Sequence, residues 1–181
     1  PAVDRAAQEA WDVWQKAISA SWTDPKYDTN AWNAWVTGTG PFPDQIVATC
    51  VARRSQMAPA LALLDRGDLM LSLLGWAATD LPAGKRGLIT ASSTRIPNLL
   101  ATRELANWLH YTSVSNPDPE PTLQQLDALY SASCLRPGCL IDAMIAIALG
   151  QIRDRAYLDL ALRGTLPEPD KLRWMAEPSQ T

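Results

Sequence analysis

Apolar residues dominate one long segment in the second half of the chain. Almost every residue from 139 to 149 is apolar, and in residues 151–163 the apolar positions fall on one side of a helix. Gly164 is a typical helix-ending residue. A helix that is apolar all round must be enclosed by other helices. The pattern therefore predicts a buried central helix in an all-α fold, with residues 140–149 covered on every side.

Shorter segments repeat their apolar residues every three or four positions, as the buried face of a helix does. Asn30 and Thr122 are expected to cap the helices that they begin. Pro59 is expected to kink or divide its helix, because proline has no amide hydrogen to donate. The predicted helices are residues 4–21, 30–36, 44–64, 95–113 and 122–135, the long helix up to 163, and a short helix at 172–175.

The chain of 181 residues suits a single helical domain, 1–181. Residues 1–66 form its N-terminal helices, 67–94 a connecting region, and 95–181 a body of helical hairpins. Within the connection, residues 68–79 fit a buried helix or an apolar strand, and we expect a helix. Short turns predict antiparallel hairpins, as in a TPR-like array, although no 34-residue repeat fits the chain.

The charges exclude one class of partner. The chain has 16 basic and 19 acidic residues, which are dispersed and give a net charge of −3. Without a dense basic cluster, nucleic acid is not an expected partner. The longest apolar run, 140–149, is interrupted by Asp142 and is too short to span a bilayer. Because the chain starts at Pro1, we expect a piece of a longer protein, in which a membrane anchor can precede this segment.

Eight tryptophans accompany a single phenylalanine, and four of them form pairs three residues apart. Trp11 pairs with Trp14, and Trp32 pairs with Trp35. Residues three apart share a helix face, so each pair makes one wide apolar patch. We interpret these patches chiefly as core anchors. The alternative is a stacking surface for a peptide or a sugar.

Cys134 and Cys139 flank the turn between two predicted helices. Their Cα atoms are expected to lie within reach of a disulfide, and the alternative is two separate buried thiols. A zinc site from these two cysteines with Cys50 and His110 lacks the paired C-x-x-C pattern of structural zinc. We therefore predict no metal and no cofactor.

No catalytic residue is predicted. His110, the single histidine, stands late in a helix, where a cation is favourable. No nucleophile motif accompanies it. The charges of residues 153–159, which include Arg155 and Asp159, fit a solvated helix face. Gly150, one turn after Ala146, predicts the close approach of a neighbouring helix.

Several segments together resemble a family of uncharacterised, exported bacterial proteins with a helical-array body. They are residues 30–36 (NAWNAWV), 58–64 (APALALL), 99–109 (LLATRELANWL) and 138–166. Residues 68–93 depart from the family pattern. The resemblance implies a periplasmic or cell-envelope location behind an N-terminal anchor or signal. It implies no activity and no functional residue.

We therefore predict a non-catalytic helical module that binds a protein or peptide. Arg103, Trp108 and Tyr111 are the expected groove residues, because arginine and aromatic side chains make good binding anchors. The alternative is small-molecule or glycan binding through the Trp-rich surface. An enzyme would need a convergent polar pocket, such as one in which His110 meets a carboxylate beside an open cavity.

Overall fold

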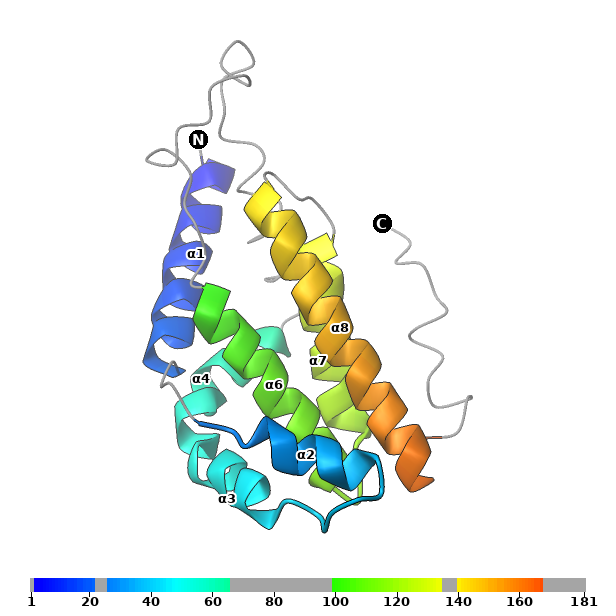
Figure 1. Ribbon diagram of the computed structural model, residues 1–181. Coiled ribbons are helices and arrows are strands. Elements are labelled where there is room, and N and C mark those ends of the chain that lie inside the picture. Colours follow the sequence, from blue (N-terminus) through cyan, green and yellow to red (C-terminus); the bar gives the residue numbers. More distant parts are fainter. Residues whose placement is uncertain (1, 22–25, 66–98, 135–139, 168–181) are drawn as a thin grey trace.

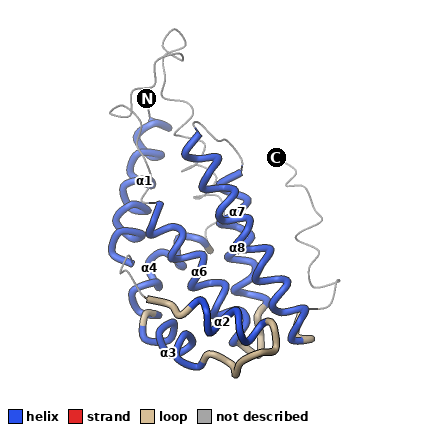
Figure 2. The backbone as a smooth tube through the Cα atoms, in the orientation of Figure 1, coloured by secondary structure: helices blue, strands red, loops and turns tan. Residues whose placement is uncertain are grey.

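The computed structural model describes residues 2–21, 26–65, 99–134 and 140–167, and every regular element within them is an α-helix. Figures 1 and 2 show this all-helical arrangement, which confirms the predicted fold class. The predictions for residues 68–79, for the final short helix and for Cys139 lie outside the described residues. The helices are α1 (Ala2–Ser21), α2 (Thr29–Val36), α3 (Asp44–Ala52), α4 (Arg54–Leu64), α6 (Leu99–Ser115), α7 (Glu120–Cys134) and α8 (Leu140–Arg163).

Helix α6 is the most enclosed helix of the fold. It contacts α1, α3, α7 and α8, and Figure 1 shows it between α1 and α8. Its small and large side chains are buried on several faces. The buried set is Ala101, Thr102, Leu105, Ala106, Trp108, Leu109, His110, Tyr111, Ser113 and Val114.

The predicted central helix exists as α8, but it is not covered on every side. Met144 and Ile147, in its apolar first half, are 60% and 63% exposed. Leu149 and Gly150 on another face are buried. This difference arises because α8 packs against α6 and α7 from one side only. The prediction of a sheathed segment at 140–149 is therefore wrong, and α6 occupies the central position instead.

Gly150 marks the closest approach between α7 and α8. A Cβ atom at this position would lie 2.9 Å from Cε2 of Tyr130. The predicted close approach of a neighbouring helix is thus confirmed, and the neighbour is α7. The guanidinium of Arg153 lies 4.1 Å from the centroid of the same ring, which fixes the ring between the two helices.

The N-terminal helices pack through a regular stripe on α1. Trp14, Ala17, Ile18 and Ser21 are buried at the three- and four-residue spacing of one helix face, and α1 contacts α4. The chain divides at Arg53, between α3 and α4, and not at Pro59. The buried Arg53 guanidinium donates to the Tyr27 hydroxyl and to the Ser21 carbonyl.

Several helix starts differ from the predictions by one or two residues, and α1 begins at Ala2, before the predicted residue 4. Asp28, not Asn30, caps α2, because its carboxylate accepts from the amides of Asn30 and Ala31. Helix α7 begins at Glu120, two residues before Thr122. The end of α8 is as predicted: Gly164 follows it with a φ of +67°, which glycine adopts without strain.

Candidate functional site

A fully buried carboxylate joins three helices. Asp159 of α8 has no solvent exposure. Its Oδ2 accepts a hydrogen bond from Nε1 of Trp32 in α2 at 2.7 Å and lies 2.9 Å from Nε2 of His110 in α6. Its Oδ1 accepts from Nε of Arg155, one turn earlier in α8, at 2.8 Å. Both carboxylate oxygens are therefore satisfied, as a buried charge requires.

The electrostatics of the cluster fix where its proton lies. Burial alone would raise the pKa of Asp159, but hydrogen bonds from His110 and Trp32, with the nearby positive charge of Arg155, hold it below its usual value. Burial lowers the pKa of His110, although the bond to Asp159 opposes this shift. Asp159 is thus ionised and His110 neutral near pH 7. Because an ionised carboxylate only accepts, His110 Nε2 is the donor.

Aromatic rings hold the histidine in place. The His110 ring stacks on Tyr111 with centroids 4.9 Å apart, and the Trp32 ring meets it edge-on at 5.3 Å. Trp32 also packs against Tyr111 at 4.5 Å and against Trp35 at 5.1 Å. The imidazole is therefore fixed on two sides by rings and at Nε2 by Asp159.

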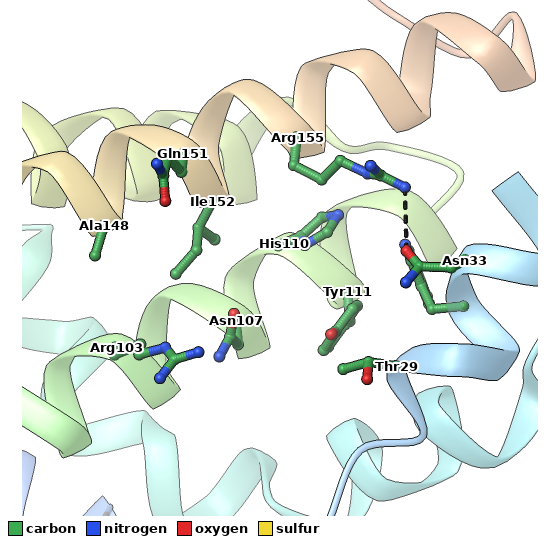
Figure 3. Close-up of a pocket in the computed structure, with 11 residues that line it drawn as sticks. Thr29, Asn33, Arg103, Asn107, His110, Tyr111, Ala148, Gln151, Ile152 and Arg155 are labelled. Atoms are coloured by element: carbon green, nitrogen blue, oxygen red, sulfur yellow. Dashed lines mark hydrogen bonds between the residues drawn. The ribbon is translucent and has the colours of Figure 1, made fainter.

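An open pocket lies over this cluster, between α2, α6 and α8 (Figure 3). Its volume is about 520 Å³. Two arginines and three side-chain amides line it, and none of its lining residues is acidic. At its edge Arg155 Nη2 donates to Asn33 Oδ1 at 3.4 Å, which links α8 to α2. The lining residues are Thr29, Trp32, Asn33, Arg103, Asn107, His110, Tyr111, Ala148, Gln151, Ile152 and Arg155.

The three predicted groove residues do not share one surface. Arg103 and Tyr111 both line the pocket. Trp108 is buried in the core, where its Nε1 donates to the Cys50 carbonyl at 2.8 Å. This separation follows from helix geometry, because Trp108 lies about 140° from Arg103 around the axis of α6, with Tyr111 between them at about 80° from Arg103.

The cysteines take separate positions. Cys50 is fully buried, and burial raises the pKa of its thiol to about 12. Cys134 ends α7 and is exposed. The predicted bridge from Cys134 stays a prediction, because Cys139 lies outside the described residues. Cys50 behaves as an inert core thiol, since a thiol with a raised pKa is a poor nucleophile.

Asp159 and Arg155 are the site residues that the sequence analysis missed. It placed Asp159 on a solvated face, but the structure buries this residue completely. A signal was present, because Asp159 follows Ala156 by three residues and precedes Leu160, and both of these are buried. An acidic residue on the inner face of a helix needs partners, and the single histidine is one of them.

The cluster supplies a fixed neutral imidazole and a compensated carboxylate beside a cationic pocket. With its Nε2 proton directed at Asp159, His110 keeps a lone pair on Nδ1. Within the described residues, no hydroxyl or thiol forms a hydrogen bond with the His110 imidazole, and the Ser113 hydroxyl donates only to the backbone carbonyl of His110. The cluster therefore does not present the nucleophile–base pair of covalent catalysis there. Its geometry is better suited to orienting a polar ligand.

Comparison with known proteins gives no match to a family model, to a curated protein or to a solved structure. Function must therefore be argued from the pocket. In the part of the chain that the structure describes, none of the helices has the length and hydropathy needed to cross a bilayer.

Proposed function

We propose that this protein binds a small, polar, anionic molecule in the pocket between α2, α6 and α8. The observation that supports the proposal is the charge of the lining: Arg103 and Arg155 contribute guanidinium groups, and no lining residue carries a carboxylate. Guanidinium groups bind carboxylates and phosphates through paired, charge-assisted hydrogen bonds. A pocket of this size accommodates a ligand of sugar-acid dimensions.

Arg103 is the main source of attraction for the anion. Arg155 is already paired with buried Asp159 at 2.8 Å, so its charge is largely compensated. Arg103 is exposed at the pocket wall. Its acidic neighbour in sequence, Glu104, does not line the pocket and lies 3.5 Å from Arg53, but it also interacts with Arg103 and with the side chain of Asn107. Because Glu104 is shared between Arg53 and Arg103, it offsets only part of the charge that Arg103 presents to a ligand anion.

The uncharged lining favours a ligand rich in hydroxyl or amide groups. Asn33, Asn107 and Gln151 each carry an amide oxygen and two N–H hydrogens, although Asn33 Oδ1 also accepts from Arg155 and the Asn107 side chain also bonds to Glu104. Trp32 contributes little stacking surface, because it is only 3% exposed and its N–H is bonded to Asp159. Small-molecule binding thus remains our proposal, but through polar groups and not through a Trp-rich surface.

The experiment compares a neutral sugar with two anionic relatives. Glucose, glucuronate and glucose 6-phosphate are titrated by calorimetry against the protein, R103A and the matched control R54A, whose arginine is exposed outside the pocket. We expect at least one anion to bind about tenfold more tightly than glucose, a preference of about 1.4 kcal/mol. R103A should lose this preference and R54A should keep it. Equal binding of glucose and both anions would refute the proposal.

A peptide carboxylate is a second candidate for the same anion. Arg103 and Tyr111, two of the residues expected to form a peptide groove, lie on the pocket wall. This version retains the sequence-based proposal of an exported, TPR-like interaction module in the cell envelope. A short peptide with a free C-terminal carboxylate should then bind more tightly than its amidated form. Equal affinities of the two peptides would contradict the peptide candidate and leave the small anionic molecule as the proposed ligand.

A further inference from the structure

Helix α8 presents an exposed ridge that runs past the pocket. We define the α8 ridge as the positions that a 3.6-residue period places on the outer face of this helix. Six of its nine residues are apolar. The ridge consists of Met144, Ile147, Ala148, Gln151, Asp154, Arg155, Leu158, Ala161 and Leu162.

The apolar residues of the α8 ridge are well exposed. Leu158 is 50% exposed and Leu162 is 61% exposed, values similar to those of Met144 and Ile147 near the other end. Single exposed apolar side chains are common on proteins, but these four share one face of one helix. A row of this kind is typical of a surface that packs against another protein.

The order of residues along the α8 ridge is symmetric about Arg153. Met144 and Leu162 lie nine positions on either side of it, Ala148 and Leu158 five, and Gln151 and Arg155 two. The intervals between these six residues alternate between four and three, which is the spacing of a helix–helix seam. Apolar residues stand at both ends of this row and polar residues in the middle.

We propose that a second copy of this chain packs its α8 antiparallel against the α8 ridge, as an isologous dimer with its two-fold axis near Arg153. In a two-fold interface each residue meets the residue at the mirrored position. Met144 of one copy then meets Leu162 of the other, and Ala148 meets Leu158. The polar middle meets itself, with Gln151 opposite Arg155.

The charges near the axis favour this arrangement over a parallel one. A two-fold rotation places Arg155 of each copy opposite the neutral Gln151 of the other, so the two arginines do not face each other. The two aspartates also approach each other, but Arg153 already lies 2.6 Å from Asp154 within each chain and offsets this repulsion. In a parallel pair, by contrast, Arg155 would face Arg155, and like charges that meet in this way are unfavourable.

The dimer would also affect the edge of the pocket. Ala148, Gln151 and Arg155 belong both to the α8 ridge and to the pocket lining. The second copy would therefore lie beside the pocket mouth. The proposed dimer does not depend on the proposed ligand, and each can fail without the other.

The first test measures mass in solution. Sedimentation of the wild type, of L158E/L162E and of the matched control V51E is followed over protein concentrations up to about 1 mM, which detects even weak association. Val51 is as exposed as the leucines but lies on α3. Wild type and V51E should dimerise, and the double variant should raise the dissociation constant at least about tenfold, with an unchanged circular dichroism spectrum. A monomeric wild type, or a dimer whose dissociation constant is unchanged by L158E/L162E, would overturn the proposal.

The second test fixes the orientation. D154C is made in a C134S/C139S background, with D44C on α3 as the matched control. Near a two-fold axis the two introduced thiols face each other, so mild oxidation should give a covalent dimer of D154C but not of D44C. Equal cross-linking of both variants, or none of D154C, would rule out the antiparallel seam.

Discussion

At the scale of single residues, Asp159 has the greatest influence on the site. It is fully buried, and it receives hydrogen bonds from an indole, an imidazole and a guanidinium on three helices. A buried charge that is hydrogen-bonded at both oxygens fixes the positions of its partners, because breaking such a buried pair costs several kcal/mol, on the order of 3–5. The pocket wall is thus held in place from beneath.

The His110–Asp159 pair predicts how stability depends on pH. The folded protein holds the pKa of His110 below 6.5, its ordinary value, so the unfolded chain binds more protons as the pH falls through 6.5. The histidine contribution is therefore complete above pH 6.5 and is lost on acidification. Asp159 does not interfere in this range, because its own pKa lies below its ordinary value of 3.8.

Urea unfolding of the wild type and of H110Q between pH 8 and pH 5 checks this prediction. Glutamine keeps a donor for Asp159 but does not titrate. The difference in unfolding free energy, wild type minus H110Q, should be constant above pH 6.5 and then fall by up to about 1.4 kcal/mol per pH unit. The other titrating groups are shared by both proteins and cancel. A difference that stays flat down to pH 5 would contradict a neutral buried His110.

At the scale of the elements, α8 shows what its sequence could and could not predict. Its end at Gly164 was predictable, because a glycine signal is local. The exposure of its outer face was not predictable. Apolar residues at 144 and 147 favour burial, but the sequence of α8 alone does not say whether another helix covers them. Likewise, the burial of Asp159 depends on His110 and Trp32, which are far away in the sequence.

G150A should destabilise the contact between α7 and α8. Alanine favours helix over glycine by about 1 kcal/mol, but its methyl group would lie 2.9 Å from the Tyr130 ring, and such overpacking costs about 1–3 kcal/mol. We expect a net loss of about 1 kcal/mol in the unfolding free energy, measured with urea. In a Y130V background, which removes the ring, the same change should be neutral or stabilising. A stabilised G150A single variant would show that the ring moves away freely.

At the scale of the whole molecule, the N-terminal helices and the hairpin body pack on each other. The contacts between α3 and α6 and between α4 and α7 cross this division, as does the bond from Gln125 to Asp65 at 2.8 Å. The all-α architecture could be predicted from periodicity alone. The central position of α6 could not be predicted, because the pattern of apolar and polar residues in α6 differs little from that of a helix covered on one side only.

These cross-contacts predict one cooperative unfolding transition. Far-ultraviolet circular dichroism follows all the helices, whereas tryptophan emission follows the core around Trp14, Trp32 and Trp108. Both signals should give the same urea midpoint within error, as a single two-state domain requires. Two separated midpoints would show that residues 1–66 unfold independently of the hairpin body.

The position of Asp159 in the chain has a consequence for synthesis on the ribosome. Trp32 lies 127 residues before it and His110 lies 49 residues before it. A nascent chain that has not yet reached residue 159 lacks the carboxylate that accepts hydrogen bonds from Trp32 and His110, even if its earlier helices have already packed together. The cluster beneath the pocket is therefore among the last parts of the described fold to be completed, and chains released early by premature termination cannot assemble it.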